Sequence, residues 1–150
     1  VLSALVNQIR KLLLAKGFVK SPLGKGWQSA CPYAYFQNQI MPAIVEYDRK
    51  LLEQLENWQN MLNAEAISQK TGSPKKGKKT KVKATTDLLI AKNPKNPYPI
   101  YLLLKKSDGF SQNQLINALE VLSEVDKKLK TSSQSPKLVL EKAILNICRI

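Results

Sequence analysis

The chemistry that this sequence could carry is suggested first by the stretch GSPKKGKKTKVK, Gly72–Lys83. Phosphate-binding loops of nucleotide-binding proteins read G-x-x-x-x-G-K-[ST], and Gly72, Gly77 and Lys78 match that pattern. Lys79 then stands where Ser or Thr is needed, and Thr80 comes one place late. The stretch is therefore close to a phosphate loop without being one.

The surroundings of this stretch also argue against a nucleotide site. A phosphate loop leaves a hydrophobic strand and enters a helix, so that backbone amides and the helix dipole meet the phosphates. The residues before Gly72 read AISQKT, the tail of a predicted helix, and no helix start follows for several positions. A second Gly-Lys pair, Gly24 and Lys25, fails because Val19 stands where the first glycine belongs.

Carboxylates at helical spacing are the next candidates for chemistry. Glu53 with Glu56 and Glu120 with Glu124 share helix faces, but a catalytic pair needs a pocket that moves the two pKa values apart. These residues lie on polar faces among lysines, so we interpret them as surface charge. Asp126 lies beside an apolar stripe, and we expect it to be partly buried and paired.

Composition excludes several further classes of site. The chain has no histidine, which removes Ser-His-Asp and Cys-His catalysis and every His-ligated metal. Cys31 and Cys148 stand far apart in no C-x-x-C pattern, which argues against a structural zinc site and a disulfide scaffold. We therefore predict no catalytic residue, no metal, no cofactor and no small-molecule substrate.

The positive charge is concentrated in one part of the chain. The net charge is +13, yet Ala66–Lys95 alone holds nine lysines and one acid, Asp87. Such a run can bind nucleic acid through its phosphates, although it has no aromatic residue or arginine to read bases. The residues for such a contact are Lys75, Lys76, Lys78, Lys79, Lys81 and Lys83. A solvated insert that binds nothing is the alternative.

The 150 residues are most simply one domain, large enough for a hydrophobic core. Because Val1 stands where an initiator Met is expected, we interpret the chain as a piece of a longer protein. It has no signal peptide and no apolar run near the ~18 residues that a membrane span needs. We expect a cytoplasmic protein with no membrane contact.

Apolar residues recur at three- and four-residue spacing through most of the chain, which predicts an all-α bundle of about five helices. The first helix is expected to stop at Gly17, a long one to start at Pro42, and the next to be capped by Asn96 and to end at Gly109. The remaining expected helices cover about 32–40, from Ser111 to about 130, and from Pro136 onwards.

Three local features complete this prediction. Ser111 and Gln114 form a capping box, S-x-x-Q, with Phe110 and Leu115 placed for a hydrophobic staple. The last helix is apolar over most of its circumference and is expected to be nearly buried. Gln69–Lys95 breaks the helical pattern and is expected to be a lysine-rich, disordered insert with a short ordered patch near its end.

Aromatic residues gather in one short region, at Trp27, Tyr33, Tyr35 and Phe36. Such a group could stack on nucleic-acid bases. We favour the interpretation that it fills the end of the helical bundle.

The C-terminal third carries a family pattern. GFSQNQLINALEVLSEVDKKLKTSSQSPKLVLEKAIL, Gly109–Leu145, resembles the end of the bacterial DNA polymerase III delta subunit, a clamp-loader component, in its Phe-Ser start, its Asp126–Lys130 phrase and its L-x-L-E at Leu138–Glu141. NPYPIYLLLKKSDGF resembles the short helix before it, and VLSALVNQIRKLLLAKG resembles the first helix of the family's collar domain. The segment Glu46–Lys95 departs from the family pattern.

This resemblance implies a role without catalysis. Clamp-loader subunits pair an AAA+-like part with a C-terminal helical collar, and the collars join the subunits into a ring that supports loading of the sliding clamp in DNA replication. The domain would then be an oligomerisation module whose partners are other clamp-loader subunits, with DNA nearby in the assembly. A free-standing basic helical adaptor that binds RNA or DNA is the alternative. Residues that could form a subunit interface are Leu115, Leu119, Leu122, Leu140, Ile144 and Ile147.

Overall fold

The computed structural model of the protein describes residues 2–68, 86–131 and 135–149. Over these ranges the fold is all-α without strands, as predicted. The five longer helices are α1 (Leu2–Lys20), α3 (Met41–Ser68), α4 (Tyr98–Asp108), α5 (Gln112–Thr131) and α6 (Pro136–Arg149). Shorter elements are the 3-10 turns Pro22–Gly24 and Thr86–Leu88, α2 (Tyr33–Tyr35) and a π-helical turn at Phe36–Ile40.

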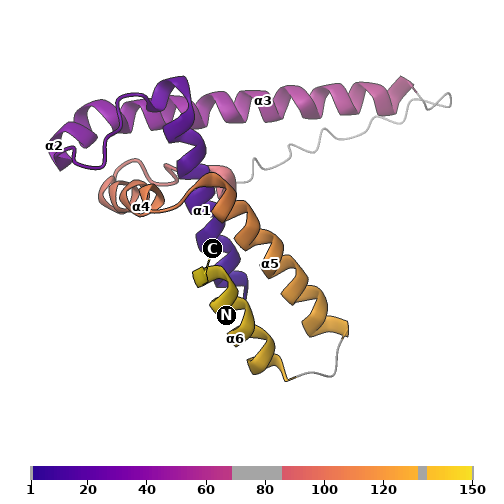
Figure 1. The fold of residues 1–150 in the computed structure, drawn as a ribbon. Helices are drawn as coiled ribbons and strands as arrows, with labels where there is room; N and C mark the ends of the chain where they lie inside the picture. The colour runs from indigo at the N-terminus through magenta and orange to yellow at the C-terminus, as the bar shows by residue number, and fades with distance from the viewer. Residues whose placement is uncertain (1, 69–85, 132–134, 150) are drawn as a thin grey trace.

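Helix α1 is the element shared by both halves of the molecule. Figure 1 shows α3 crossing near one end of α1, while α5 and α6 form an antiparallel pair beside the other end. Helix α1 contacts α4 on one side and α5 on another. The side chains of α1 accordingly contribute to two separate groups of buried residues.

The first core joins α1, α3, α4 and the segment between α1 and α2. Its fully buried side chains include Phe18, Phe36 and Leu104, and the rings of Trp27 and Tyr101 meet edge to face with centroids 6.0 Å apart. The expected aromatic cluster is therefore a core cluster, although Tyr35 itself is exposed. Burial of rings of this size is a major stabilising contribution in a small domain.

Polar contacts fix the connection that carries these aromatics. Trp27 Nε1 donates to Asp108 Oδ2 at 2.9 Å, and Tyr101 Oη donates to the carbonyl oxygen of Cys31 at 3.0 Å. Gly24 lies so close to the end of α1 that a Cβ atom there would collide with the carbonyl oxygen of Phe18. This glycine therefore has a packing role, which explains a residue that otherwise looks like part of a phosphate loop.

The second core joins the first half of α1 to α5 and α6. Ile9 of α1 is buried with Leu115, Ala118 and Leu122 of α5. Further along α5, Val125 is buried against α6, on which Val139 and Ala143 are the covered residues. Helix α5 therefore buries one stripe with 3-4 spacing, as its sequence pattern predicts.

Helix α1 does not stop at Gly17, and that prediction was wrong. The helix continues to Lys20, and the next residue, Ser21, still donates its backbone N–H to the Gly17 carbonyl at 3.1 Å. A glycine inside a helix costs only about 1 kcal/mol. Phe18, which is fully buried against the edge of the Tyr47 ring, anchors the extra turn. Tertiary burial thus outweighs the local stop signal.

The long helix expected to start at Pro42 is α3, which begins at Met41, so this prediction is confirmed to within one residue, although helical structure runs without a break from Tyr33 through Ser68. The π-helical turn Phe36–Ile40 lies directly before the proline, and the Met41 N–H donates to the carbonyl of Phe36, five residues back. A proline inside an α-helix clashes with the carbonyl four residues earlier, and a π-type turn relieves such crowding. The short helical segment expected at about 32–40 thus runs directly into α3 through this turn.

The signals around α4 and α5 are mostly confirmed. Helix α4 begins at Tyr98 after Pro97, so Asn96 is not its cap, and Gly109 follows its last residue as expected. At α5 the capping box is present in both directions. The Gln114 N–H donates to Ser111 Oγ at 3.1 Å, and the Ser111 N–H donates to Gln114 Oε1 at 2.7 Å.

We expect Ser111→Ala to lower the free energy of unfolding by about 1 kcal/mol, because the Gln114 N–H loses its acceptor. Urea unfolding followed by circular dichroism measures this change. Ser111→Asp should keep most of the stability, since a carboxylate also accepts from the first turn. Ser123→Ala, in the exposed middle of the same helix, is the matched control and should be neutral or slightly stabilising. Equal losses for Ser111→Ala and Ser123→Ala would contradict the cap.

Candidate functional site

The residues that sequence reasoning weighed for catalysis lie apart on the surface. Glu53 accepts from Arg49, and Glu124 lies 3.9 Å from Lys128. Asp126 is half-buried and paired with Lys130 at 2.5 Å, as expected. Among the described residues no three acids or cysteines converge in a way that could hold a metal ion.

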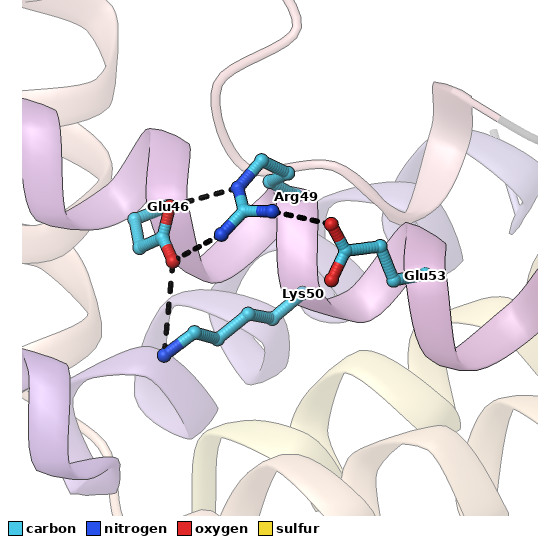
Figure 2. A network of polar contacts seen from close by, with 4 residues as sticks. All are labelled: Glu46, Arg49, Lys50 and Glu53. Carbon is cyan, nitrogen blue, oxygen red and sulfur yellow. Dashed lines mark hydrogen bonds and ion pairs between the residues drawn. The ribbon is translucent and has the colours of Figure 1, made fainter.

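The densest polar network is a row on α3, shown in Figure 2. The Arg49 guanidinium donates to Glu46 through both Nε, at 2.9 Å, and Nη2, at 2.6 Å, and reaches Glu53 one turn further on. The hydrogen bond from Arg49 is the main cause that lowers the pKa of Glu46. All of these groups are solvent-exposed and lie on one helix, so the network supports the helix and forms no pocket.

Asp48 is the buried carboxylate that the sequence did not reveal. Its side chain is only 5% exposed. Oδ1 accepts the Ile90 N–H at 3.1 Å, and Oδ2 accepts the Ala91 N–H at 2.7 Å. Burial raises the pKa of Asp48, while the two backbone hydrogen bonds act in the opposite direction. Since both oxygens are occupied by backbone donors, Asp48 fastens the segment after Thr86 to α3 and does not act as a proton acceptor for a substrate.

Helix α6 is less buried than its sequence pattern indicates, and the expectation of a nearly buried helix was wrong. Val139 and Ala143 are covered by α5, but Leu138, Ile144 and Leu145 are 47%, 42% and 61% exposed. At about 100° per residue, Leu138 and Leu145 lie on nearly the same line of the helix. We call Leu138, Ile144 and Leu145 the outer face of α6.

Some of the predicted interface residues are buried inside the chain, and others are partly or fully exposed. Leu115 and Leu122 are buried between α1 and α5, so the chain itself already covers them. Leu119, Leu140 and Ile147 are half-buried at the edges of these clusters. Only Ile144 belongs to the exposed outer face.

A second exposed apolar stripe lies on the far half of α3. Figure 1 shows α3 extending past the rest of the molecule on one side. Trp58, Met61 and Leu62 there are each about two-thirds exposed, at 65%, 64% and 64%. Large apolar side chains that stay exposed at helical spacing, as these do among the described residues, are typical of a protein–protein contact.

The six lysines proposed for nucleic-acid contact, Lys75 to Lys83, fall outside the described residues. So does most of the expected insert. The chain is described again from Thr86 to Thr131, and Ile90 is buried in the first core, as expected of an ordered patch.

The described helices cover one another in part and leave apolar side chains of α3 and α6 exposed. Residues 78–147 match the model of a protein family described as DNA polymerase III delta subunit, C-terminal domain. The match covers just under half of the chain, and this segment is similar to that family, a non-catalytic domain family of clamp loaders. The resemblance seen in Gly109–Leu145 is thereby confirmed.

The matched span contains α4, α5 and nearly all of α6, together with the two backbone donors that Asp48 binds. Residues 1–17, which also resemble the family, lie outside it. No curated protein and no solved structure matches the chain. None of the described helices is long and apolar enough to cross a membrane.

We expect Asp48→Ala to lower the free energy of unfolding by roughly 1–3 kcal/mol, because it leaves the N–H groups of Ile90 and Ala91 without an acceptor. Asp48→Asn should cost less, since its amide oxygen still accepts one of them. Urea unfolding measures both changes. Glu56→Ala, an exposed carboxylate on the same helix, is the control and should stay within about 0.5 kcal/mol of the wild type.

Comparing the wild type with Asp48→Asn at several pH values tests whether folding raises or lowers the pKa of Asp48. Because the folded pKa lies above the usual value of 3.8, the folded state holds this proton more tightly than the unfolded state does. The resulting stabilisation is complete below the unfolded pKa and is lost as pH rises through the folded pKa. The stability of the wild type relative to Asp48→Asn should therefore fall between acid and neutral pH. A difference that grows with pH would show that the hydrogen bonds outweigh burial.

Proposed function

We propose that this chain is the C-terminal collar of a clamp-loader delta subunit and joins that subunit to its neighbours in the loader. It would thereby support loading of the sliding clamp in DNA replication, in the cytoplasm. The family match supplies the context. The observation that carries the proposal is the outer face of α6, because three large apolar side chains there remain exposed within the chain.

The chemistry of the outer face fits a contact between subunits. Apolar side chains at the centre of an interface lose their water when a partner covers them, which favours association. The charged residues that border them, Lys137 and Glu141, lie 3.9 Å apart on the same helix and satisfy each other. Lys142, between Leu138 and Leu145 on the same side of the helix, is exposed and has no ion-pair partner among the described residues, so a partner that covers these leucines would best offer it a carboxylate. No catalytic group is needed for this role.

The test is complex formation with the other subunits of the same clamp loader. We expect the wild type to co-elute with them in size-exclusion chromatography at micromolar concentration, and Leu145→Asp to weaken the complex by at least roughly tenfold, since burying an unpaired charge is costly. Asn146→Asp adds the same charge to the neighbouring exposed position outside the outer face and should leave the complex intact.

Circular dichroism must show that Leu145→Asp still folds, which its 61% exposure favours. Absence of any complex with the wild type would contradict the collar function. A complex that tolerates Leu145→Asp and Ile144→Asp as well as Asn146→Asp would place the contact on another surface, such as the far half of α3.

We propose a second and independent role for the lysine run. Its side chains would contact the DNA on which the clamp loader acts. What favours it is charge, because Ala66–Lys95 carries nine lysines against one acid. Lys75, Lys76, Lys78, Lys79, Lys81 and Lys83 would bind phosphates without reading bases.

Replacing these six lysines by glutamine should weaken DNA binding and lower the slope of log K against log salt by about 0.9 for each phosphate that is no longer neutralised. Fluorescence anisotropy with a labelled duplex at several salt concentrations measures both. Replacement by arginine preserves the charge and is the control. An unchanged salt slope in the glutamine variant would rule out this role of the lysines and would equally exclude a free-standing nucleic-acid adaptor that uses them.

A further inference from the structure

A groove with an apolar floor lies between α1, α4 and the segment that Asp48 fastens. Its volume is about 680 Å³, within the range of about 300–1,000 Å³ that ligand sites occupy. Leu12 of α1, Leu89 of the segment, and Ile100 and Leu103 of α4 contribute to its lining. Figure 1 shows α4 and the chain before it lying beside α1. None of the groove's lining residues belongs to the outer face of α6.

The rim of the groove is positively charged. Lys11, Lys92 and Lys106 line it, each from a different wall. Lys11 and Lys92 also line a smaller adjoining cleft of about 150 Å³ together with Arg10 and Asp87. Lys92 Nζ donates to Asp87 Oδ1 at 2.8 Å, and this hydrogen bond is the main cause that lowers the pKa of Asp87; the charges of Arg10 and Lys11 lower it further. One acid thus faces several bases, and the groove has an excess of positive charge.

The residues that line the groove favour a peptide over a nucleic acid. It contains no aromatic ring on which a nucleic-acid base could stack, and its apolar floor offers nothing to a phosphate backbone. Three side-chain amides, those of Gln8, Asn93 and Asn96, line the groove, and amides can both donate to and accept from a peptide backbone. Apolar side chains fit the floor, and carboxylates fit the lysines of the rim.

We propose that this groove binds a segment of a partner protein that combines apolar side chains with carboxylates. The apolar side chains would cover Leu12 and Leu103, and the carboxylates would pair with Lys11 and Lys106. Neither lysine has an ion-pair partner among the described residues. The site is separate from the outer face of α6, so this binding does not depend on the collar function.

The probe is a fluorescein-labelled peptide of leucine and glutamate residues, and anisotropy measures its binding to the whole chain. We expect saturable binding that weakens as salt is added, because rim ion pairs are screened. A peptide with glutamine in place of glutamate should bind at least roughly tenfold more weakly, and so should one with serine in place of leucine. Equal binding of all three peptides, or none at millimolar concentration, would overturn the proposal.

Variants of the lining residues test whether the peptide binds in the groove. Lys106→Glu should weaken binding about tenfold by replacing attraction with repulsion. Lys105→Glu is the matched control, because Lys105 lies over the Tyr101 ring, 5.0 Å from its centroid, and does not line the groove. Leu102→Asp, at an exposed position on the groove wall, should also weaken binding without unfolding the chain. If Lys105→Glu and Lys106→Glu weaken peptide binding equally, the effect comes from the net charge of the protein, and the proposed site is contradicted.

Competition with two other ligands tests whether the groove binds a class of molecule other than a peptide. Unlabelled decanoate that binds more tightly than the peptide would assign the groove to a small amphiphilic anion and overturn the proposal. Duplex DNA that displaces the peptide equally from the wild type and from Leu102→Asp would assign it to nucleic acid and overturn it too. Leu145→Asp should bind the peptide like the wild type, so failure of the collar function leaves this result unaffected.

Discussion

The burial of α1 on two sides is the interaction on which the rest of the structure depends. Ala15 and Phe18 are fully buried with the aromatic residues, and Ile9, further back on the same helix, is buried with α5. A small residue such as Ala15 lets the neighbouring helices approach closely, and Phe18 then fills the space beside it. Lys16 adds a polar link by donating from Nζ to the Ser107 carbonyl at the end of α4, at 3.1 Å.

This arrangement explains how a segment outside the matched family span belongs with the part inside it. Helices α4 and α5 fall within residues 78–147, yet each completes its buried face with side chains of α1. Without α1, Leu115 and Leu122 would lose their cover on that side. The family segment therefore depends on residues 2–20 for its own core.

Local rules predicted the elements of this fold well where a local interaction decides the outcome. The capping box at Ser111 needs only Gln114, three residues on, and it is present as predicted. The failure at Gly17 occurred where packing of distant residues outweighs a local signal. The sequence indicates that a glycine weakens a helix, but it does not show that tertiary contacts carry the helix through Gly17.

The candidate site was only partly predictable for a related reason. An apolar pattern over most of α6 indicates that both sides need cover, but it does not say whether this chain or a partner supplies it. Asp48 gives no local sign of burial, because its donors, Ile90 and Ala91, are more than 40 positions away. The groove likewise needs walls from α1, α4 and the chain between Thr86 and Tyr98, so no single motif encodes it.

The π-helical turn before Pro42 also sets the rotational phase of everything that follows on α3. A π turn accommodates one residue more than an α turn, so α3 is rotated by about 100° relative to a helix continued regularly from Tyr33. That rotation decides which side chains of α3 face α1 and which face solvent. Losing a single residue from Phe36–Ile40 would leave the composition almost unchanged, yet it would turn Asp48 away from Ile90 and bring a different row of α3 against the core. The turn therefore works as a spacer whose length, more than its chemistry, aligns Asp48 of α3 with the backbone of Ile90 and Ala91.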